Sequence, residues 1–158
     1  MRLKNSLSAA FALILALATN AQAQDDVTVL RVAANGVEQE FTLAELQALP
    51  EQSFETTTIW TEGPQEFAGV SLKTLLDHLT VTHGDINATA INDYTITIPF
   101  EDATRAGPII AYHMNGDEMT RRGKGPLWIV YPYDSDLKYQ TETIYSRSIW
   151  QLDRITIE

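Results

Sequence analysis

Two Asn-Gly pairs, at residues 35–36 and 115–116, constrain the fold of this chain more than any other feature. Asn-Gly is the strongest short-range signal for a hairpin turn, because both residues tolerate a positive φ. The first pair separates the alternating segments 27–33 and 37–41, and the second follows the apolar segment 109–114. We therefore expect a β-hairpin to open the domain and strands to dominate its second half.

Further segments are typical of strands because they are rich in β-branched and aromatic residues. They span residues 54–60, 88–91, 94–98, 127–131 and 149–157. These strands follow one another at irregular intervals, without the regular strand-helix alternation of a parallel doubly wound sheet. The pattern predicts an α+β fold.

Two helices are predicted between the strands. Thr42 and Glu45 form a capping box ahead of a short apolar helical pattern that Pro50 ends. Ser71 caps a second helix, whose apolar face belongs to the core. The residues of that face are Leu72, Leu75, Leu76 and Leu79.

The first 23 residues are organised like an export signal. Arg2 and Lys4 precede an apolar run at 7–18, and small residues at 21 and 23 fit a cleavage site. We expect cleavage after Ala23, which leaves residues 24–158 as a single periplasmic domain. A membrane anchor is the alternative, but the run is shorter than the ~20 apolar residues that a spanning helix needs. No membrane insertion is expected after cleavage.

Composition excludes several classes of function. The chain has no cysteine, which removes thiolate nucleophiles, redox dithiols and cysteine ligands to a metal. Its 21 acidic residues outnumber 11 basic ones, for a net charge of −10, and loss of Arg2 and Lys4 would make this −12. Such a charge opposes nucleic acid and anionic lipid as partners.

No catalytic or metal-binding motif is present. His78, His83 and His113 lack the tight pairing on one element that brings metal ligands together. No Gly-x-Ser-x-Gly elbow occurs, and Ser146 is followed by Arg147, which cannot act as a general base. The spacing of residues indicates no catalytic residue and no metal ligand.

Aromatic residues gather beside a few polar side chains. We single out Trp60, Asn92, Asp93, Tyr94, Tyr131, Tyr133, Tyr145, Ser146 and Arg147 as candidate ligand-binding residues. Large aromatic residues are usually core residues. An Asp and an Arg among them, however, must be paired or must face a ligand if they are buried. A flat heteroaromatic ligand suits such a set.

Several short motifs follow one another in a characteristic order. They are Phe-Ala-Gly-Val at 67–70, Asn-Asp-Tyr at 92–94, Gly-Pro-Leu-Trp-Ile-Val-Tyr-Pro at 125–132 and Ile-Trp at 149–150. This order resembles the molybdopterin-binding domain of the sulfite oxidase family, over roughly residues 54–157. The resemblance implies mixed sheets with two or three short helices, and the motifs are individually short but collectively specific.

The sequence departs from the catalytic members of that family. In them a strand ahead of the Phe-x-Gly-Val motif delivers the cysteine that ligates molybdenum, whereas residues 57–63 here hold none. The variants Trp-Thr-Glu-Gly-Pro at 60–64 and Tyr-Ser-Arg-Ser at 145–148 look like a stand-alone periplasmic subgroup. Its characterised relatives bind free pterins without molybdenum and signal to a membrane sensor that controls cyclic-di-GMP turnover and biofilm formation.

The resemblance therefore implies a non-catalytic, pterin-binding regulator without a metal, acting on the periplasmic domain of an inner-membrane sensor. On a pterin, Asp93 would accept hydrogen bonds from N2 and N3, and Arg147 would donate to O4 and N5. Trp60 and one of three tyrosines would stack on the ring; these are Tyr131, Tyr133 and Tyr145.

Alternatives stay open both for single residues and for the function of the whole chain. Asp93 is equally a turn residue, and Arg147 equally a member of a surface ion pair. The whole chain is alternatively a molybdopterin-dependent oxidoreductase with an altered site that lacks the cysteine ligand. A third reading is a pure protein-interaction module.

Overall fold

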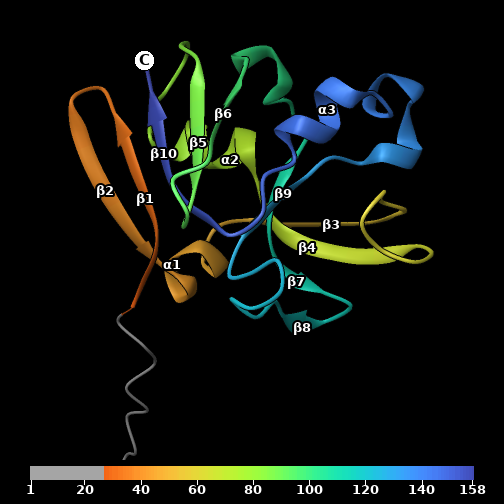
Figure 1. The fold of residues 1–158 in the computed structure, drawn as a ribbon. Coiled ribbons are helices and arrows are strands. Elements are labelled where there is room, and N and C mark those ends of the chain that lie inside the picture. Colours follow the sequence, from red (N-terminus) through yellow and green to blue (C-terminus); the bar gives the residue numbers. More distant parts are fainter. Residues whose placement is uncertain (1–26) are drawn as a thin grey trace, which may run out of the picture.

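The computed structural model describes residues 27–158, which form two sheets and three short α-helices (Figure 1). The signal peptide predicted for residues 1–23 lies outside the described residues. Within residues 27–158 no helix is long and apolar enough to cross a membrane. The architecture confirms the α+β prediction.

The first sheet has the order β2-β1-β10-β5-β6. Its strands are β1 (Thr28–Ala34), β2 (Val37–Thr42), β5 (Ile86–Ala90), β6 (Thr95–Ile98) and β10 (Leu152–Ile157). Strand β10 pairs in parallel with β1, and the other neighbours are antiparallel. The last strand of the chain therefore joins the first hairpin to the β5–β6 hairpin.

The second sheet has the order β3-β4-β7-β8, with β9 also paired to β7. Its strands are β3 (Glu51–Thr56), β4 (Gln65–Ser71), β7 (Ile109–Met114), β8 (Asp117–Glu118) and β9 (Trp128–Val130). All pairs are antiparallel. An isolated bridge between Trp128 and Trp150 brings the end of this sheet to the segment that precedes β10.

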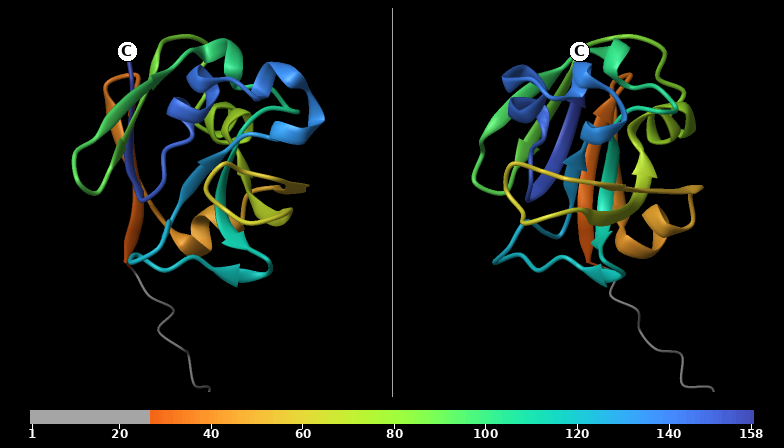
Figure 2. Two further views of the ribbon diagram at one scale, coloured as in Figure 1. Left: turned by 45° about the vertical axis from the view of Figure 1, so that its right-hand side comes forward. Right: turned by 90° about the vertical axis from the view of Figure 1, so that its right-hand side faces the viewer.

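The helices are short and lie between strands. They are α1 (Leu43–Gln47), α2 (Leu72–His78) and α3 (Glu142–Arg147), with three 3-10 turns, η1 (Phe100–Asp102), η2 (Tyr133–Ser135) and η3 (Leu137–Tyr139). Helix α3 packs against β6, and η2 contacts both η3 and β3. Figure 2 shows α3 and the neighbouring turns together at one corner of the molecule.

The local signals in the sequence have the expected effects. Asn35 and Gly36 have φ of 53° and 75°, and the second Asn-Gly pair also has positive φ, as tight hairpins require. The Thr42–Glu45 capping box is formed at α1, and Ser71 caps α2. The hairpins and both helix starts are confirmed.

One core runs through the domain. Fully buried side chains come from the first sheet (Leu30), the second sheet (Phe67, Trp128) and α2 (Leu75, Leu76). Burial of such large apolar side chains contributes roughly 1.5–3 kcal/mol each. Leu79, predicted on the same helix face, is only partly buried because the helix ends before it.

Two predicted strands have a wrong boundary, and one helix was missed. The strand predicted for 54–60 ends at Thr56, because Thr57 donates both its N–H and its hydroxyl to Asp134 instead of to a neighbouring strand. The strand predicted from residue 149 begins at Leu152, because Gln151 has φ of 51°. Helix α3 was not expected.

Candidate functional site

A cavity of about 360 Å³ lies where three segments distant in sequence meet. The β3–β4 loop, the β5–β6 turn, and the segment from α3 to β10 form its wall. The lining residues are Trp60, Ala90, Asn92, Tyr94, Tyr145, Ser146, Ser148, Ile149, Trp150 and Gln151. None of them carries a formal charge at neutral pH, so the wall is aromatic and neutral-polar.

Trp60 is the centre of the aromatic wall. Its ring meets four others edge to face, with centroid distances of 5.4 Å to Trp150, 5.8 Å to Trp128, 5.9 Å to Tyr145 and 6.4 Å to Tyr133. Edge-to-face contacts of this kind are favourable because the positive ring edge meets the negative ring face. Trp60 is partly exposed and packs against the core.

The loop that carries Trp60 is tied to η2. The Asp134 carboxylate accepts from the Thr57 N–H at 2.6 Å and from the Thr57 hydroxyl at 2.7 Å. In return, the Thr56 hydroxyl accepts from the Asp134 N–H at 3.1 Å. These hydrogen bonds, first of all that of the Thr57 N–H, lower the pKa of Asp134. The ionised carboxylate therefore fixes the start of the Trp60 loop.

Helix α3 presents Tyr145 and Ser146 to the cavity and is anchored from behind. Arg147 donates from Nη1 to Asp102 Oδ2 at 2.8 Å, and the Tyr131 hydroxyl donates to the same oxygen at 2.8 Å. Burial, reinforced by the charge of Asp102, raises the pKa of Tyr131, so its hydroxyl stays a donor. Asp102 thus holds α3 through Arg147.

Ser148 links the end of α3 to the core. Its hydroxyl accepts from the Tyr133 hydroxyl at 2.6 Å and donates to the Ile144 carbonyl at 2.9 Å, and its carbonyl accepts from Trp128 Nε1 at 3.1 Å. Burial raises the pKa of Tyr133, which keeps this hydroxyl protonated. The polar groups of Trp128 and Tyr133, which lie behind the wall, therefore have hydrogen-bond partners within the protein.

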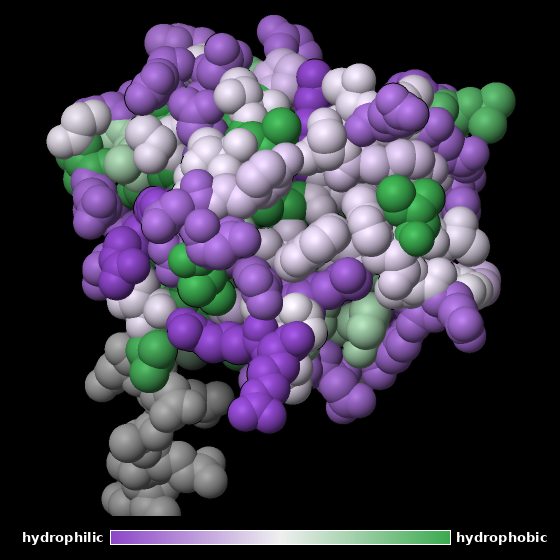
Figure 3. Space-filling view, viewed as in Figure 1, coloured by the Kyte–Doolittle hydropathy of each residue, from purple (hydrophilic) through white to green (hydrophobic). Residues whose placement is uncertain are grey.

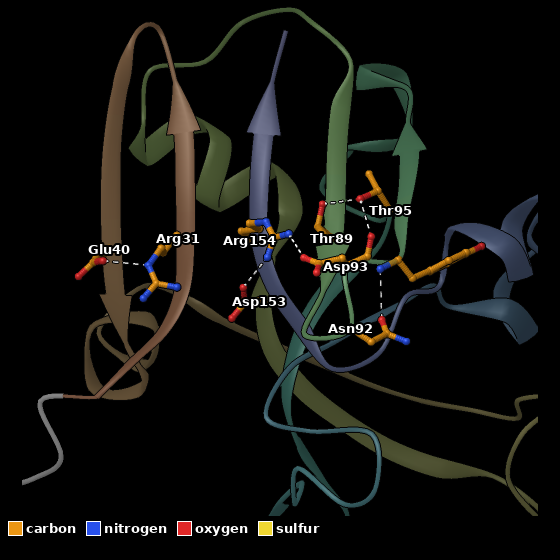
Figure 4. Close-up of polar contacts among 9 residues, drawn as sticks. Arg31, Glu40, Thr89, Asn92, Asp93, Thr95, Asp153 and Arg154 are labelled. Atoms are coloured by element: carbon orange, nitrogen blue, oxygen red, sulfur yellow. Dashed lines mark hydrogen bonds and ion pairs between the residues drawn. The ribbon is translucent and has the colours of Figure 1, made fainter.

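The β5–β6 turn places two neighbouring side chains differently (Figure 4). Asn92 lines the cavity, and its Oδ1 accepts from the Tyr94 N–H at 3.2 Å. Asp93 has φ of 66°, and its carboxylate pairs with Arg154, which also contacts Asp153 at 3.0 Å. With 81% of its side chain exposed, Asp93 occupies the turn position that was its alternative reading.

The structure brings five of the nine predicted site residues to the cavity, namely Trp60, Asn92, Tyr94, Tyr145 and Ser146. It does not bring the other four there. Asp93 and Arg147 are held in ion pairs with Arg154 and Asp102. Tyr131 and Tyr133 are buried and bonded to Asp102 and Ser148.

Sequence reasoning left two prominent wall residues out of the site. Trp150 belongs to the same aromatic-rich segment as Tyr145, and that closeness was a usable signal. Gln151 carried no signal, because its place in the wall depends on a left-handed backbone conformation just before β10.

Such a wall favours a flat, uncharged heterocycle, since aromatic faces stack and neutral amides both donate and accept hydrogen bonds. A metal centre would need other side chains. Among residues 27–158 no group of three or more His, Asp or Glu side chains is placed to hold a metal ion.

Comparison with known proteins adds two findings. The model of a protein family described as oxidoreductase molybdopterin binding domain matches residues 19–135. The crystal structure of the sulfane dehydrogenase SoxCD from Paracoccus pantotrophus superposes with a TM-score of 0.61 at 18% sequence identity. That match covers 81% of this chain and 37% of the SoxCD chain, and it shows a common fold. No curated protein matches the chain.

Proposed function

Because the chain belongs to the family of oxidoreductase molybdopterin-binding domains, we propose that it binds a free pterin in its aromatic cavity and acts as a non-catalytic regulator. The observation that carries the proposal is the chemistry of the cavity wall. It combines four large aromatic side chains with neutral polar groups in about 360 Å³, near the lower end of small-molecule sites. A bicyclic heterocycle is suited to a space of that size.

The residues present fit one part of a molybdenum cofactor and not the others. The pterin ring matches the aromatic wall. Molybdenum in the catalytic relatives takes a cysteine ligand, and the chain has no cysteine. A phosphate group calls for cationic donors, and no lysine, arginine or histidine lines the cavity. The site therefore favours an unphosphorylated pterin without a metal.

Asn92 is the side chain best placed to recognise the edge of the ring. Its Oδ1 has one lone pair engaged by the Tyr94 N–H, which leaves one lone pair and both amide hydrogens for a ligand. Trp60, Tyr145 and Trp150 supply the apolar surfaces. In this proposal Asn92 takes the role that the sequence suggested for Asp93.

A regulatory role is supported by what the sequence lacks as well as by the resemblance noted above. The sequence has no cysteine and no motif typical of a catalytic nucleophile or a metal site. The protein would therefore act by binding its ligand and not by converting it. With the export signal expected at residues 1–23, the partner would be the periplasmic domain of an inner-membrane sensor, coupled to cyclic-di-GMP turnover. Ligand affects such a partner only if the free and bound forms differ in their affinity for it.

A second candidate is an oxidoreductase that uses molybdopterin without the cysteine ligand. The family description and the structural similarity to a dehydrogenase favour it. A pure protein-interaction module, in which the cavity has no ligand, is the third possibility.

Extraction of the purified protein separates the three. The protein is denatured, and the extract is assayed for pterin fluorescence and, by mass spectrometry, for molybdenum. Pterin alone supports the regulator, and pterin together with molybdenum supports the oxidoreductase. If neither is found, calorimetry with added pterin decides, because absence of binding leaves the interaction module. Asn92→Ala should weaken binding, whereas Asn87→Ala, on β5 and bonded to Thr97, should not.

A further inference from the structure

The basic side chains of this acidic protein are distributed unevenly. Five of the nine within residues 27–158 form ion pairs, namely Arg31, Lys73, Lys138, Arg147 and Arg154. Four have no ion-pair partner among the described residues, namely Arg105, Arg121, Arg122 and Lys124. Three of these four lie in one short turn between β8 and β9, which we call the basic turn (residues 119–125).

The backbone of the basic turn is held by internal hydrogen bonds. Gly123 and Gly125 both donate their N–H to the Thr120 carbonyl, at 3.0 and 2.9 Å. A Cβ on Gly125 would lie 1.8 Å from the Met119 carbonyl oxygen, so this residue admits no side chain. Arg121 and Arg122 are exposed on this fixed backbone. The fold therefore sets the place on the surface from which the two arginine side chains extend.

The basic turn is bonded directly to the wall of the aromatic cavity. Gln151 donates its N–H to the Lys124 carbonyl at 2.9 Å and its Nε2 to the Arg121 carbonyl at 2.7 Å. Lys124 Nζ lies 4.2 Å from the centre of the Trp150 ring, a cation–π distance. Gln151 and Trp150 line the cavity, whereas Lys124 does not. These contacts therefore connect the cavity wall to the basic turn outside it.

A hollow of about 620 Å³ adjoins the basic turn and has mixed chemistry. Its lining includes the basic residues Arg122 and Lys124 and the acidic residues Asp117 and Glu118, and Met114 and Met119 contribute apolar surface. A uniformly anionic surface, such as a lipid bilayer, would be repelled by the two carboxylates and by the net charge of the chain. A short peptide can place an acidic group beside Arg122 and Lys124 and an apolar side chain on Met114 and Met119. The net charge of the chain opposes such a peptide less than it opposes an extended anionic surface, because exposed charges more than about 10 Å away are screened at about 0.1 M salt.

The face drawn in Figure 3 gives a partner little continuous apolar area. On the face shown in Figure 3, apolar patches are small and separated by hydrophilic residues. The exposed large apolar side chains are scattered as Val27, Val37, Ile59, Ile91, Tyr94 and Leu137. Recognition by charge is therefore favoured over a broad apolar interface.

We propose that the basic turn and its hollow bind an acidic segment of a partner protein, and that a ligand in the aromatic cavity changes this affinity through Gln151 and Trp150. The binding surface stands without the proposed function, whereas the coupling rests on it. A ligand that contacts Trp150 or Gln151 would alter the hydrogen bonds and the cation–π contact that these residues make with the basic turn, and so alter the surface that the partner binds. The coupling is reciprocal, so the partner must change ligand affinity by the same factor.

The surface is tested first, without pterin, by fluorescence anisotropy. The probe is a labelled Glu-Leu-Glu-Asp-Leu-Glu peptide, compared with its Gln and Asn counterpart. We expect the acidic peptide alone to bind, more weakly as salt rises, and roughly fivefold more weakly to the Arg121→Gln/Arg122→Gln double variant. Arg105→Gln is the matched control and should bind like the parent.

Three results would refute the proposed binding surface. The first is equal affinity for the acidic peptide and its Gln and Asn counterpart, and the second is a loss of affinity in Arg105→Gln as large as that in the double variant. The third is that phosphatidylglycerol vesicles bind through Arg121 and Arg122 whereas the peptide does not bind. The coupling is tested next by repeating the peptide titration in saturating pterin. We expect a shift of severalfold, reduced in Gln151→Asn, which tolerates the left-handed backbone but has a shorter amide. Pterin binding without any shift refutes the coupling, whereas absence of pterin binding refutes the proposed function and leaves the surface standing.

Discussion

Arg147 and Asp102 form an ion pair at 2.8 Å whose side chains are only 21% and 19% exposed. The pair joins the end of α3 to η1, and Asp102 also accepts from the Tyr131 hydroxyl. A residue that the sequence suggested for ligand binding therefore has a structural partner. Its effect on the cavity is indirect, through the helix that carries Tyr145 and Ser146.

Asp102→Asn should lower the free energy of unfolding by about 1.5–3 kcal/mol, because it removes a charge-assisted hydrogen bond and leaves Arg147 uncompensated. Urea denaturation measures the loss. Glu40→Gln removes the partner of Arg31 from an exposed pair that solvent screens, so it should destabilise the protein much less than Asp102→Asn does. Equal losses in the two variants would show that the α3 anchor is energetically an ordinary surface pair.

Adjacent residues of the β5–β6 turn should behave oppositely toward pterin. Asp93→Asn keeps a residue that tolerates the left-handed conformation and loses only an exposed pair, so affinity should stay within about twofold. Asn92→Ala removes the amide from the cavity and should weaken binding by about 1 kcal/mol or more. Calorimetry with pterin compares them. The reverse order of effects would return Asp93 to the site.

Stability should depend on pH through Asp134. Its pKa is lowered in the folded protein by hydrogen bonds from Thr57, so the ionised form is the stabilising one. The contribution is present above the unfolded-state pKa of about 3.9 and is lost as pH falls through the lower folded-state pKa. Asp134→Asn should therefore be less stable than the parent at pH 7, and the difference should shrink below about pH 4.

Thermal melts at a series of pH values record this difference. Asp117→Asn, at an exposed position of β8 without an ion pair among the described residues, serves as the control. A constant gap between Asp134→Asn and the parent at all pH values would mean that the Thr57 contacts do not depend on the charge.

Gly69→Ala should be strongly destabilising. A Cβ there would lie 2.0 Å from the Ile110 carbonyl oxygen and 2.6 Å from the Ala111 Cα, both in the backbone of β7. Separating the two strands costs about 1–3 kcal/mol. Gly123→Ala meets nothing closer than 3.4 Å and should change stability by less than about 0.5 kcal/mol. Similar urea midpoints for both would disprove the close approach of β4 to β7.

The predictability of this fold depends on sequence distance. The Asn35–Gly36 turn and the Thr42–Glu45 capping box are fixed by residues within a few positions of one another, and the sequence identified them. The parallel pairing of β1 with β10 joins opposite ends of the domain and has no local signal. The wrong end of the strand predicted for 54–60 has the same cause, since Thr57 is drawn away by Asp134, 77 positions later.

The candidate site follows the same rule. Aromatic residues such as Trp60 and Tyr145 could be singled out by type, because large rings beside polar groups suit a flat ligand. Charged residues could not be assigned, because their roles depend on a partner that only the tertiary structure supplies. Arg147 meets Asp102 across 45 positions, and Asp93 meets Arg154 across 61.

The three tryptophans of the chain, Trp60, Trp128 and Trp150, are all within 6.4 Å of one another by ring centroid. Indoles at such separations exchange excitation energy, so light absorbed by any one of them is shared across the group. The protein therefore carries a built-in optical reporter of a single region. Its tryptophan emission monitors the cavity wall and the core directly behind it, while the β1–β2 hairpin at the other end of the first sheet, which holds no tryptophan, contributes almost nothing to that signal.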